Sequence, residues 1–577
     1  MFQDDFVWGV ASSAYQVEGT DKEDGRGDCV WDAFAREGKI YENQNADIAS
    51  DHMHRYKEDF ALMRNLGIKA YRFSLNWARI LPEGTGKVNE KAIALYRDMI
   101  IEMKKNGIVP YVTLFHWEYP LALQEKGGWL NPDSVEWFAE YAGVVAENLS
   151  DLAEYFITLN EPQCFVGLGH LSGLHAPGLK LEPKEVFQIA HNALKAHGRA
   201  VQELRKHAKQ PIQVGYAPTC GVAYPYTESP EDIEAARKVY FGFDQPITNW
   251  TWNVAWFNDP VFLGKYPENG LKKYAEYLPV ITDEDMELIH QPLDFMGQNI
   301  YNGYWIRAGK DGEPEYVDRP AGFPKTATNW PVTPECIYWG VRFLYERYKL
   351  PIYLTENGMA CHDQISADGK VHDSNRIDFL DKYLSCVQRA VEEGIDIRGY
   401  FLWTFLDNFE WERGYSERFG VVYVDYATQK RIVKDSAFWY QRVIESNGEI
   451  LSVNRTKREI LHMEPVLEQT MWDGDCVIRE GRFEGKTLSQ LWTECPELFG
   501  NLGMNLLSAF DEYRVWKLNI AGKAEVNQEY PFLIMNVIEG DGIMEGRLIK
   551  KGDCFIVPNG YGKVQLQGNL QIVASTV

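Results

Sequence analysis

Two glutamates, each at the end of a short apolar run, are the residues of this chain best placed to do chemistry. Glu161 lies in Thr158-Leu159-Asn160-Glu161-Pro162, and Glu356 lies in Leu354-Thr355-Glu356-Asn357-Gly358. The runs before them are rich in β-branched and aromatic residues, so each glutamate is predicted at the carboxyl end of a strand. Two carboxyl groups placed in this way suit glycoside hydrolysis. One protonates the leaving oxygen, and the other attacks or stabilises the anomeric carbon.

Eight runs of this kind occur along the chain, and several are separated by stretches with helical periodicity. The runs are Phe6 to Ala11, Ile68 to Ser74, Ile108 to Phe115, Tyr155 to Leu159, Ile212 to Ala217, Leu293 to Gln298, Ile352 to Thr355 and Ile397 to Trp403. Helices are predicted over Asn89 to Lys105, Pro132 to Asn148 and Pro183 to Lys206. Near-continuous apolar strands that alternate with helices predict a parallel sheet, and eight such units predict a closed (β/α)8 TIM barrel in an α/β protein.

Polar and aromatic residues gather at the carboxyl ends of these runs. They are Arg72, His116, Trp117, Asn160, Glu161, Asn299, Glu356 and Trp403, and Gln16 follows the first run on its loop. Because a (β/α)8 barrel brings the carboxyl ends of all its strands to one face, we expect these side chains to meet in one pocket.

Composition narrows the partners of the chain. Its 577 residues are too many for one ordinary domain, and its formal net charge is -24. That charge repels the phosphate backbone of nucleic acid and the surface of an anionic membrane, so we predict neither as a partner. No apolar stretch is long enough to span a bilayer.

The N-terminus and the cysteines point to the cytoplasm. The chain begins Met1-Phe2-Gln3-Asp4-Asp5, without a basic leader or a long apolar segment, which predicts no secretory signal. Its nine cysteines are scattered and form no Cys-x-x-Cys pair, which favours reduced thiols over disulfides or a zinc site. Asp51-His52-Met53-His54 has a spacing seen in metal sites, but it opens a helical run, so we predict no metal there.

An ordered series of motifs gives the first 445 residues a family resemblance. The motifs are residues 6–19 (Phe6-Val7-Trp8-Gly9 to Tyr15-Gln16-Val17-Glu18-Gly19), Tyr71-Arg72-Phe73-Ser74, Leu114-Phe115-His116-Trp117, the two glutamate motifs, and residues 402–411 (Leu402-Trp403-Thr404 to Phe409-Glu410-Trp411). With them the chain resembles glycoside hydrolase family 1, the β-glucosidase family. The resemblance implies a retaining β-glycosidase of the β-glucosidase type, without a cofactor, that hydrolyses small, non-phosphorylated β-glycosides through a covalent glycosyl-enzyme.

The resemblance also implies roles for individual residues. Glu161 matches the general acid/base, Glu356 the nucleophile, and Arg72 the arginine that orients the nucleophile. The family's carboxyl groups are about 5 Å apart, a spacing at which a charged Glu356 disfavours ionisation of Glu161. The predicted substrate-binding residues are Gln16, His116, Trp117, Asn160, Asn299, Tyr301, Trp403 (the floor under the sugar ring), Glu410 and Trp411.

The tail has a different pattern. Short β-like runs alternate with predicted glycine turns, among them Gly540-Asp541-Gly542, which predicts an all-β sandwich or barrel. The motif order resembles the cupin part of bacterial mannose-6-phosphate isomerases. His462 is the only histidine after His372, and one histidine is too few for the metal site of such an isomerase. We therefore expect a structural, oligomerising or aglycone-side accessory domain. We predict domains over residues 1–445 (barrel) and 491–577 (cupin or jelly roll), joined by residues 446–490, with a homo-oligomer as an open alternative.

Two other functions fit the same fold. A 6-phospho-β-glycosidase would hold its phosphate with Ser, Lys and Tyr, where this chain has Glu410, Glu417 and Phe419. Two of these replacements are acidic and would repel a phosphate dianion. A non-catalytic sugar-binding protein would normally have lost one of the two glutamates. The sequence leaves open the natural glycone (glucose, galactose or fucose), the aglycone, and the balance of hydrolysis against transglycosylation.

Overall fold

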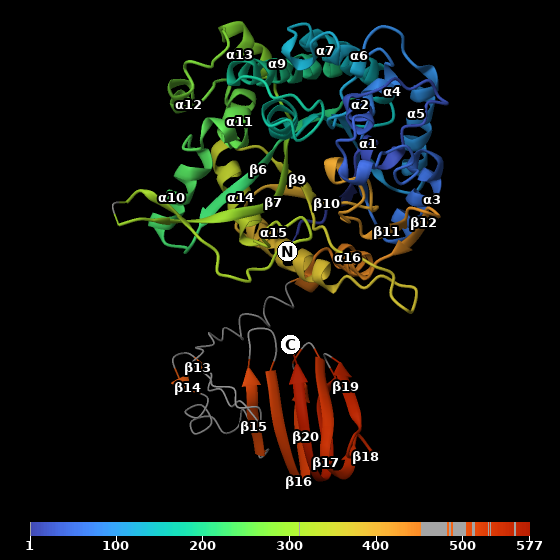
Figure 1. Cartoon of the computed structure of the whole chain (residues 1–577), viewed down its shortest axis with the longest axis vertical. Helices are drawn as coiled ribbons and strands as arrows, with labels where there is room; N and C mark the ends of the chain where they lie inside the picture. The colour runs from blue at the N-terminus through green and yellow to red at the C-terminus, as the bar shows by residue number, and fades with distance from the viewer. Residues whose placement is uncertain are drawn as a thin grey trace. The chain divides into compact units, whose positions relative to one another are not determined.

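The computed structural model divides the chain into two compact units, residues 1–455 and 456–577 (Figure 1). It describes residues 2–310, 312–451, 482–483, 486–487, 503–509, 514–528, 530, 532–558 and 561–576. Most of the predicted connection over 446–490 lies outside these residues, so the domain boundaries stay a prediction. In the part of the chain that is described, no helix has the length and apolar character needed to cross a membrane.

Eight parallel strands of the first unit form a closed ring. They are β1 (Val7–Ala11), β2 (Ala70–Ser74), β3 (Val109–Phe115), β4 (Tyr155–Asn160), β5 (Gln213–Ala217), β7 (Phe295–Ala308), β9 (Ile352–Asn357) and β10 (Ile397–Trp403). Each strand pairs with the next in this order, and β10 pairs with β1 to close the ring. The predicted (β/α)8 barrel is confirmed, with a strand at each of the eight predicted runs.

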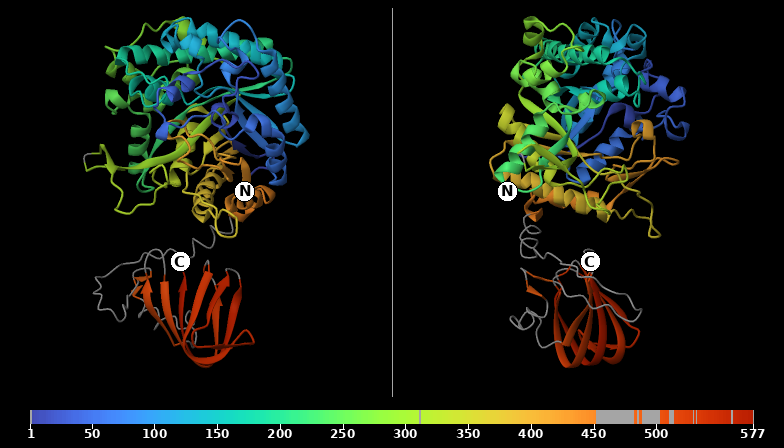
Figure 2. Two further views of the ribbon diagram at one scale, coloured as in Figure 1. Left: turned by 45° about the vertical axis from the view of Figure 1, so that its right-hand side comes forward. Right: turned by 60° about the vertical axis from the view of Figure 1, so that its left-hand side comes forward.

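Helices pack around this ring (Figures 1 and 2). The longer ones are α3 (His52–Asn65), α5 (Glu90–Lys105), α7 (Ser134–Leu149), α9 (Pro183–His207), α10 (Pro230–Phe241), α11 (Val254–Leu263), α14 (Glu335–Tyr348), α15 (Ser374–Glu392) and α16 (Asp435–Glu445). The shorter ones are α1 (Ala14–Glu18), α2 (Val30–Arg36), α4 (Trp77–Ile80), α6 (Leu121–Gln124), α8 (Pro162–Val166), α12 (Glu268–Lys273) and α13 (Asp283–Ile289). The three predicted helices correspond to α5, α7 and α9, with ends that differ by up to two residues.

One strand of the ring is much longer than predicted. The predicted run ended at Gln298, but β7 continues to Ala308 because two further strands pair with its second half. These are β6 (Thr219–Pro225), which lies parallel to it, and β8 (Pro314–Val317), which lies antiparallel. Asn299 therefore lies within β7 and not at its end, in register with Glu356 of β9. A separate hairpin, β11 (Val422–Asp425) and β12 (Lys430–Val433), precedes α16.

Aromatic and small side chains fill the inside of the ring. Residues of one buried cluster come from all eight strands and the segments next to them, among them Ala11, Ala70, Tyr111, Ile157 and Phe401. The rings of Tyr111 and Tyr155 stack at a centroid distance of 4.2 Å. Because the ring is packed in this way, the barrel is not a pore, and its polar residues are directed to the ends of the strands.

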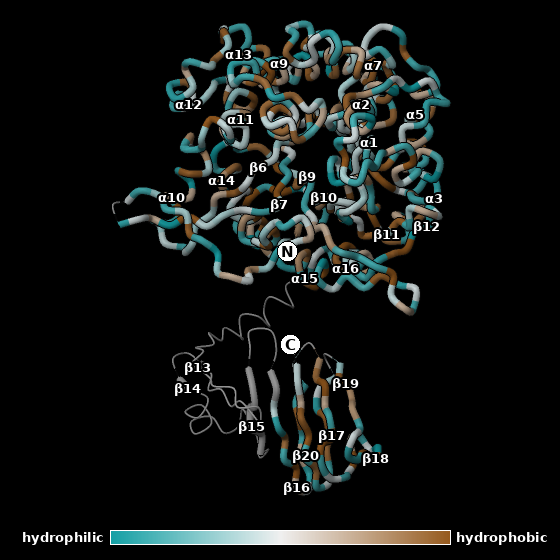
Figure 3. Tube along the Cα trace, viewed as in Figure 1, coloured by the Kyte–Doolittle hydropathy of each residue, from teal (hydrophilic) through white to brown (hydrophobic). Residues whose placement is uncertain are grey.

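The described part of the second unit contains an antiparallel sheet. Its strands are β15 (Gly503–Ala509), β16 (Arg514–Gln528), β17 (Phe532–Met544), β18 (Arg547–Lys550), β19 (Cys554–Pro558) and β20 (Gly562–Thr576). A short hairpin, β13 (Arg482–Phe483) and β14 (Lys486–Thr487), is also described. Hydrophobic and hydrophilic residues alternate along β20 (Figure 3), and the alternate residues Val564, Leu566, Leu570 and Ile572 are buried. The predicted all-β class is confirmed.

The turn predicted at Gly540-Asp541-Gly542 is wrong. These residues lie inside β17, which pairs with β20 on one side and with β18 on the other. Gly540 has φ +81, and a Cβ there would lie 1.9 Å from the carbonyl oxygen of Asn569. The glycine therefore permits a close approach of two backbones within the sheet and does not end the strand.

Candidate active site

The two glutamates lie on neighbouring parts of the barrel face where the strands end. Glu161 directly follows β4 and precedes α8, whose first residue is Pro162. Proline favours the first helical position, so the chain turns from strand to helix at Glu161, which has a left-handed φ of +44. Glu356 lies in β9. Both side chains are buried, with 6% and 3% of their surfaces exposed.

Glu356 is held by a cation and a phenol. Arg72 donates from Nη1 to Oε1 at 2.7 Å, and the hydroxyl of Tyr301 donates to Oε2 at 2.6 Å. Burial raises the pKa of Glu356, and Arg72 and Tyr301 oppose this rise because they stabilise the carboxylate. Both oxygens of Glu356 are thus fixed in direction, which suits a carboxylate that must approach one carbon atom.

Glu161 has no cationic partner of its own. Asn299 donates to Oε1 at 2.7 Å, and the thiol of Cys164 donates to Oε2 at 3.2 Å. Burial and the nearby charge of Glu356 raise the pKa of Glu161 to about 7. A carboxyl group whose pKa is raised toward neutral pH suits a role that requires it both to give and to take a proton.

A set of amides fixes the two glutamates relative to each other. Asn160 accepts from Arg72 at 2.6 Å and from Asn299 at 3.1 Å, and it donates to Nε2 of His116 at 3.1 Å. Thr355 donates to Oδ1 of Asn299 at 2.6 Å, which sets the direction of the Asn299 amide toward Glu161. Every link in this set is buried, so the positions of the carboxyl groups depend on it.

His116 borders the site and has a buried ring nitrogen without a described partner. Burial and the charge of Arg72 lower the pKa of His116 well below its usual range, so the ring is neutral. Its Nε2 accepts from Asn160, which leaves the proton on Nδ1, and no described residue binds that buried atom. The described residues therefore offer no acceptor for the proton on Nδ1.

Gln16 and Glu410 form the other polar pair of the site. Gln16 accepts from Ser13 at 2.7 Å and donates to Glu410 at 3.1 Å. Burial and the neighbouring carboxyl groups of Glu412, Glu356 and Glu417 raise the pKa of Glu410 well above its usual range. The ring of Trp411 stacks on Tyr15, and the ring of Trp403 stacks on His116 at 5.7 Å. Aromatic faces and fixed hydrogen-bond groups together are suited to a sugar ring.

These side chains border a cavity of about 820 Å³. Eight of the twelve predicted site residues line it, namely His116, Trp117, Glu161, Tyr301, Glu356, Trp403, Glu410 and Trp411. The other four, Arg72, Gln16, Asn160 and Asn299, lie behind them and bind them directly. The structure thus brings all twelve residues together.

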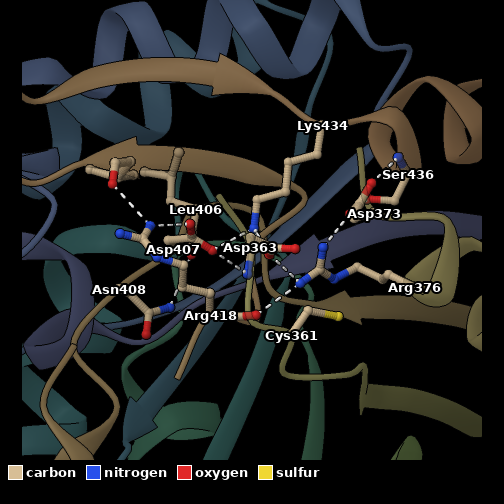
Figure 4. A network of polar contacts seen from close by, with 12 residues as sticks. Cys361, Asp363, Asp373, Arg376, Leu406, Asp407, Asn408, Arg418, Lys434 and Ser436 are labelled. Carbon is tan, nitrogen blue, oxygen red and sulfur yellow. Dashed lines mark hydrogen bonds and ion pairs between the residues drawn. The ribbon is translucent and has the colours of Figure 1, made fainter. Parts of the chain in front are cut away.

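A buried network of charges holds the loop that carries Glu410 (Figure 4). Lys434 donates to Asp363 at 2.5 Å and to Asp407 at 2.8 Å, and Arg418 donates to Asp407 at 2.6 Å. Arg376 donates to Asp363 at 2.7 Å. Asp363 belongs to the loop after β9 and Asp407 to the loop after β10, so the network ties the two loops to α15 and α16.

The described residues offer little for a metal. Among them, no three His, Cys, Asp or Glu side chains are grouped to hold an ion. His52, at the start of α3, pairs with Asp59 at 2.8 Å, and His54 pairs with Asp51 at 2.6 Å. His462 lies outside the residues that the structure describes.

Sequence reasoning missed several residues of the site, among them Cys164, Thr355 and Trp330. Cys164 stands one helical turn after Glu161, a spacing that could have suggested the contact. Thr355 precedes Glu356 on a strand, where neighbouring side chains alternate between faces, so the spacing gave no signal for its contact with Asn299. Trp330 lines the cavity from an irregular segment that has no periodic pattern to mark it.

Comparison with known proteins agrees with this geometry. The family model of glycosyl hydrolase family 1 matches residues 1–449, and that of the mannose-6-phosphate isomerase cupin domain matches residues 506–577. Beta-glucosidase A of Thermotoga maritima is 44% identical over 449 residues, which cover 78% of this chain and 98% of that protein. The 1,4-beta-D-glucan glucohydrolase of Thermotoga neapolitana is 44% identical over 451 residues, or 78% and 99% of the two chains.

Solved structures lead to the same family. The beta-glucosidase from Thermotoga maritima in complex with glucoimidazole superimposes with a TM-score of 0.71 at 44% sequence identity. The match covers 78% of this chain and 99% of that one. The chain therefore belongs to glycosyl hydrolase family 1 and is a glycoside hydrolase with a C-terminal cupin-like domain.

Proposed function

We propose that this enzyme is a retaining β-glucosidase in which Glu356 is the nucleophile and Glu161 the general acid/base. The observation that carries the proposal is the unequal surroundings of the two carboxyl groups. Arg72 and Tyr301 favour the charged form of Glu356, whereas burial and the charge of Glu356 raise the pKa of Glu161 to about 7. Burial raises the pKa of both groups, but only Glu356 is hydrogen-bonded to a cation that opposes the rise, and such unequal surroundings are the pattern of an acid and a nucleophile.

The two steps of the reaction follow from these surroundings. In the first step, Glu356 attacks the anomeric carbon while Glu161 gives its proton to the leaving oxygen. The ester that forms removes the negative charge of Glu356, and with it one cause of the raised pKa of Glu161. Glu161 then accepts a proton from the water that releases the sugar.

The glycone is proposed to lie in the closed end of the cavity. Gln16, His116 and Trp411 are each no more than 3% exposed. His116 and the Gln16–Glu410 pair are proposed to bind hydroxyls, and Trp403 to form the apolar floor. Glucose as the glycone is supported by the relatives, several of which are named β-glucosidases.

A phosphorylated glycone fits this end poorly. The carboxyl groups of Glu412 and Glu417 lie close enough to Glu410 to raise its pKa. Two arginines of the same loop are already paired, since Arg418 binds Asp407 at 2.6 Å and Arg413 pairs with Glu412 at 3.3 Å. A phosphate dianion would therefore meet acidic groups while these two cations are engaged elsewhere.

The cytoplasm is the proposed location, and it rests on the cysteines. Among the described residues, five buried cysteines are free thiols. The assembly state is left open, with a homo-oligomer built through the C-terminal domain as one proposal.

The test is the anomer that the enzyme releases first. Proton NMR during hydrolysis of 4-nitrophenyl β-glucoside should show β-glucose before mutarotation. Initial α-glucose would exclude the double displacement. In parallel, kcat/KM for the plain glucoside should exceed that for its 6-phosphate, and the reverse order would favour a 6-phospho-β-glycosidase. No turnover of either substrate would favour a non-catalytic sugar-binding protein.

A further inference from the structure

Two carboxyl groups lie close together in the loop after β10. Glu410 directly precedes the helical turn Trp411–Arg413, and Glu412 lies within that turn. Both side chains line the active-site cavity. Two carboxyl groups that interact in a buried place disfavour each other's charge, so the partners of each group decide which of the two is ionised.

Glu412 has partners that favour its charged form. Its Oε2 lies 2.8 Å from Nε2 of His175, which belongs to the segment between α8 and α9, and its Oε1 lies 3.3 Å from Nε of Arg413. Because a carboxylate only accepts hydrogen bonds, Nε2 carries a proton whether the ring of His175 is neutral or charged. Burial raises the pKa of Glu412, but the contact with His175 opposes this rise, and the resulting pKa lies below its usual range. Glu412 is therefore ionised at neutral pH.

Glu410 has no such partner. Among the described residues, its carboxyl group is bound by the neutral amide of Gln16, which donates to Oε2 at 3.1 Å, and by no cation. Burial and the carboxyl groups of Glu412, Glu356 and Glu417 raise the pKa of Glu410 well above its usual range. Because Gln16 donates to Oε2, a proton on Glu410 lies on Oε1.

The titratable groups around Glu410 come from several elements of the barrel. They are Glu412 and Glu417 on the same loop, Glu356 on β9, Tyr301 on β7, and Tyr426 after β11. The two phenols are neutral, because burial raises the pKa of each well above its usual range. The other three are carboxyl groups, and among them Glu412 has the largest effect on the pKa of Glu410.

Aromatic rings hold His175 against Glu412. The ring centroid of His175 lies 5.4 Å from that of Trp31 and 5.3 Å from that of Trp117. Trp411, the residue before Glu412, packs on the same two tryptophans, with its centroid 4.7 Å from each. All four rings are buried. Because they pack on one another, the contact between His175 and Glu412 is fixed before a sugar binds.

We propose that His175 is a positioning residue that keeps the negative charge on Glu412, so that Glu410 holds a proton on Oε1 and meets the glycone as a neutral acid. A neutral acid can donate one hydrogen bond to a hydroxyl and accept others, whereas a carboxylate only accepts. The inference rests on the proposed function, since it places the glycone against Glu410. It gives His175 and Glu412 a role that acts on the sugar through Glu410.

Infrared spectroscopy tests this proton without any turnover, because a protonated carboxyl group and a carboxylate absorb at different positions. The difference spectrum between the unaltered enzyme and Glu410→Gln at neutral pH should show the loss of a protonated carboxyl band. Loss of a carboxylate band instead would overturn the proposal. The measurement needs no substrate, so its outcome is distinct from a failure of the proposed function, which the released anomer and the 6-phosphate comparison detect.

The same difference spectrum, recorded in a second set of variants, tests the role of His175. In Glu412→Gln, the pH at which Glu410 loses its proton should fall by about one unit or more, because a neighbouring negative charge is removed. In His175→Phe, which keeps a ring but no donor, part of the protonated band at neutral pH should move from Glu410 to Glu412. Arg413→Gln is the matched control. This cation pairs with the same carboxylate but is 58% exposed, so the shift should stay below about 0.3 unit.

An unchanged pH of proton loss in Glu412→Gln would show that Glu412 does not act on Glu410, and it would overturn the proposal. A protonated band that stays entirely on Glu410 in His175→Phe would overturn the role of His175. So would equal effects of His175→Phe and Arg413→Gln. A substitution that only disturbed the packing would change the KM for 4-nitrophenyl β-glucoside without moving the pH at which Glu410 loses its proton.

Discussion

The barrel and the C-terminal sheet bury very different side chains. At the strand ends of the barrel, Arg72, Glu356, Asp407 and Lys434 are almost fully buried and paired. In the C-terminal unit, the buried polar residues among the described side chains are Gln528 and Thr576, and neither is charged. Among its described residues, the ion pair of Lys563 with Glu525 lies on the surface.

This difference indicates that the barrel carries the chemistry and that the C-terminal sheet is built around an apolar core. A buried charge is costly unless partners stabilise it, so a fold that keeps many of them does so where their chemistry or their positioning is needed. The cupin-like sheet instead buries apolar residues such as Leu533, Met535, Leu570 and Ile572. We therefore expect the barrel to carry the hydrolysis and the sheet to fold around its own core.

The largest effect should come from removing the carboxylate of Glu356. In Glu356→Gly, turnover of an aryl β-glucoside should fall by about 10⁴-fold or more, because the covalent step loses its nucleophile. Azide should restore turnover and yield α-glucosyl azide, since the small anion attacks from the vacated side. The measurement is product NMR with and without azide. A β-azide, or no rescue in a folded variant, would contradict the assignment.

Glu161→Gln should have the next largest effect, and one that depends on the leaving group. For substrates with poor leaving groups, kcat/KM should fall about 10²- to 10⁴-fold, because general acid catalysis is lost. For substrates that release dinitrophenolate, kcat/KM should fall far less. The pH profile gives a second measurement. Glu161 acts when protonated and has a pKa of about 7, so kcat/KM of the unaltered enzyme should fall as pH rises through about 7. In Glu161→Gln this fall of kcat/KM above about pH 7 should be absent. An unchanged fall in the variant would mean that another group causes it.

Lys434→Met tests whether the buried network holds the sugar-binding loop. Removing the ammonium leaves Asp363 and Asp407 with one cation each, and breaking such a buried pair costs about 3–5 kcal/mol. Urea unfolding should show this loss, and KM should rise more than kcat falls because the loop carries Glu410. Lys382→Met is the matched control. Its exposed pair with Asp378 is worth about 0.5 kcal/mol or less. Equal effects of the two substitutions would mean that the network does not stabilise the fold.

The sequence predicted the barrel well because its strands are buried on both faces. Such strands read as near-continuous apolar runs, as residues 352–355 of β9 do, and their polar ends mark the pocket. The second half of β7 was not predicted, because Asn299 and Asn302 interrupt its apolar pattern. Its strand character comes from pairing with β6 and β8, and that pairing is not visible in the local sequence.

The tail was harder to predict for a related reason. Glycine in a strand and glycine in a turn look alike in a sequence, and only the partner strand decides between them. At Gly540 the carbonyl of Asn569, on β20, lies where a side chain would be. The open part of the cavity was missed altogether, since Tyr316 and Trp330 belong to segments too short or irregular for a periodic signal.

The smallest effect should follow from removing the C-terminal unit. The cut belongs after Arg455 and not directly after α16, because the residues that follow this helix pack on the barrel. Asn447 accepts from Nε1 of Trp8 at 2.9 Å, and Leu451 is fully buried. All twelve predicted site residues precede this cut, so kcat/KM for an aryl glucoside should change less than about 2-fold.

The truncated enzyme also tests what the C-terminal unit does. Its molar mass in solution should be compared with that of the full chain by light scattering, and its metal content by elemental analysis. If the unit joins subunits, the truncation should lower the assembly state and leave the aryl-glucoside chemistry intact. Loss of that chemistry in a folded truncation would place part of the active site in the tail. A stoichiometric transition metal in the full chain that disappears with the tail would contradict the division between a reactive barrel and a packed sheet, because the tail would then hold a charged site of its own.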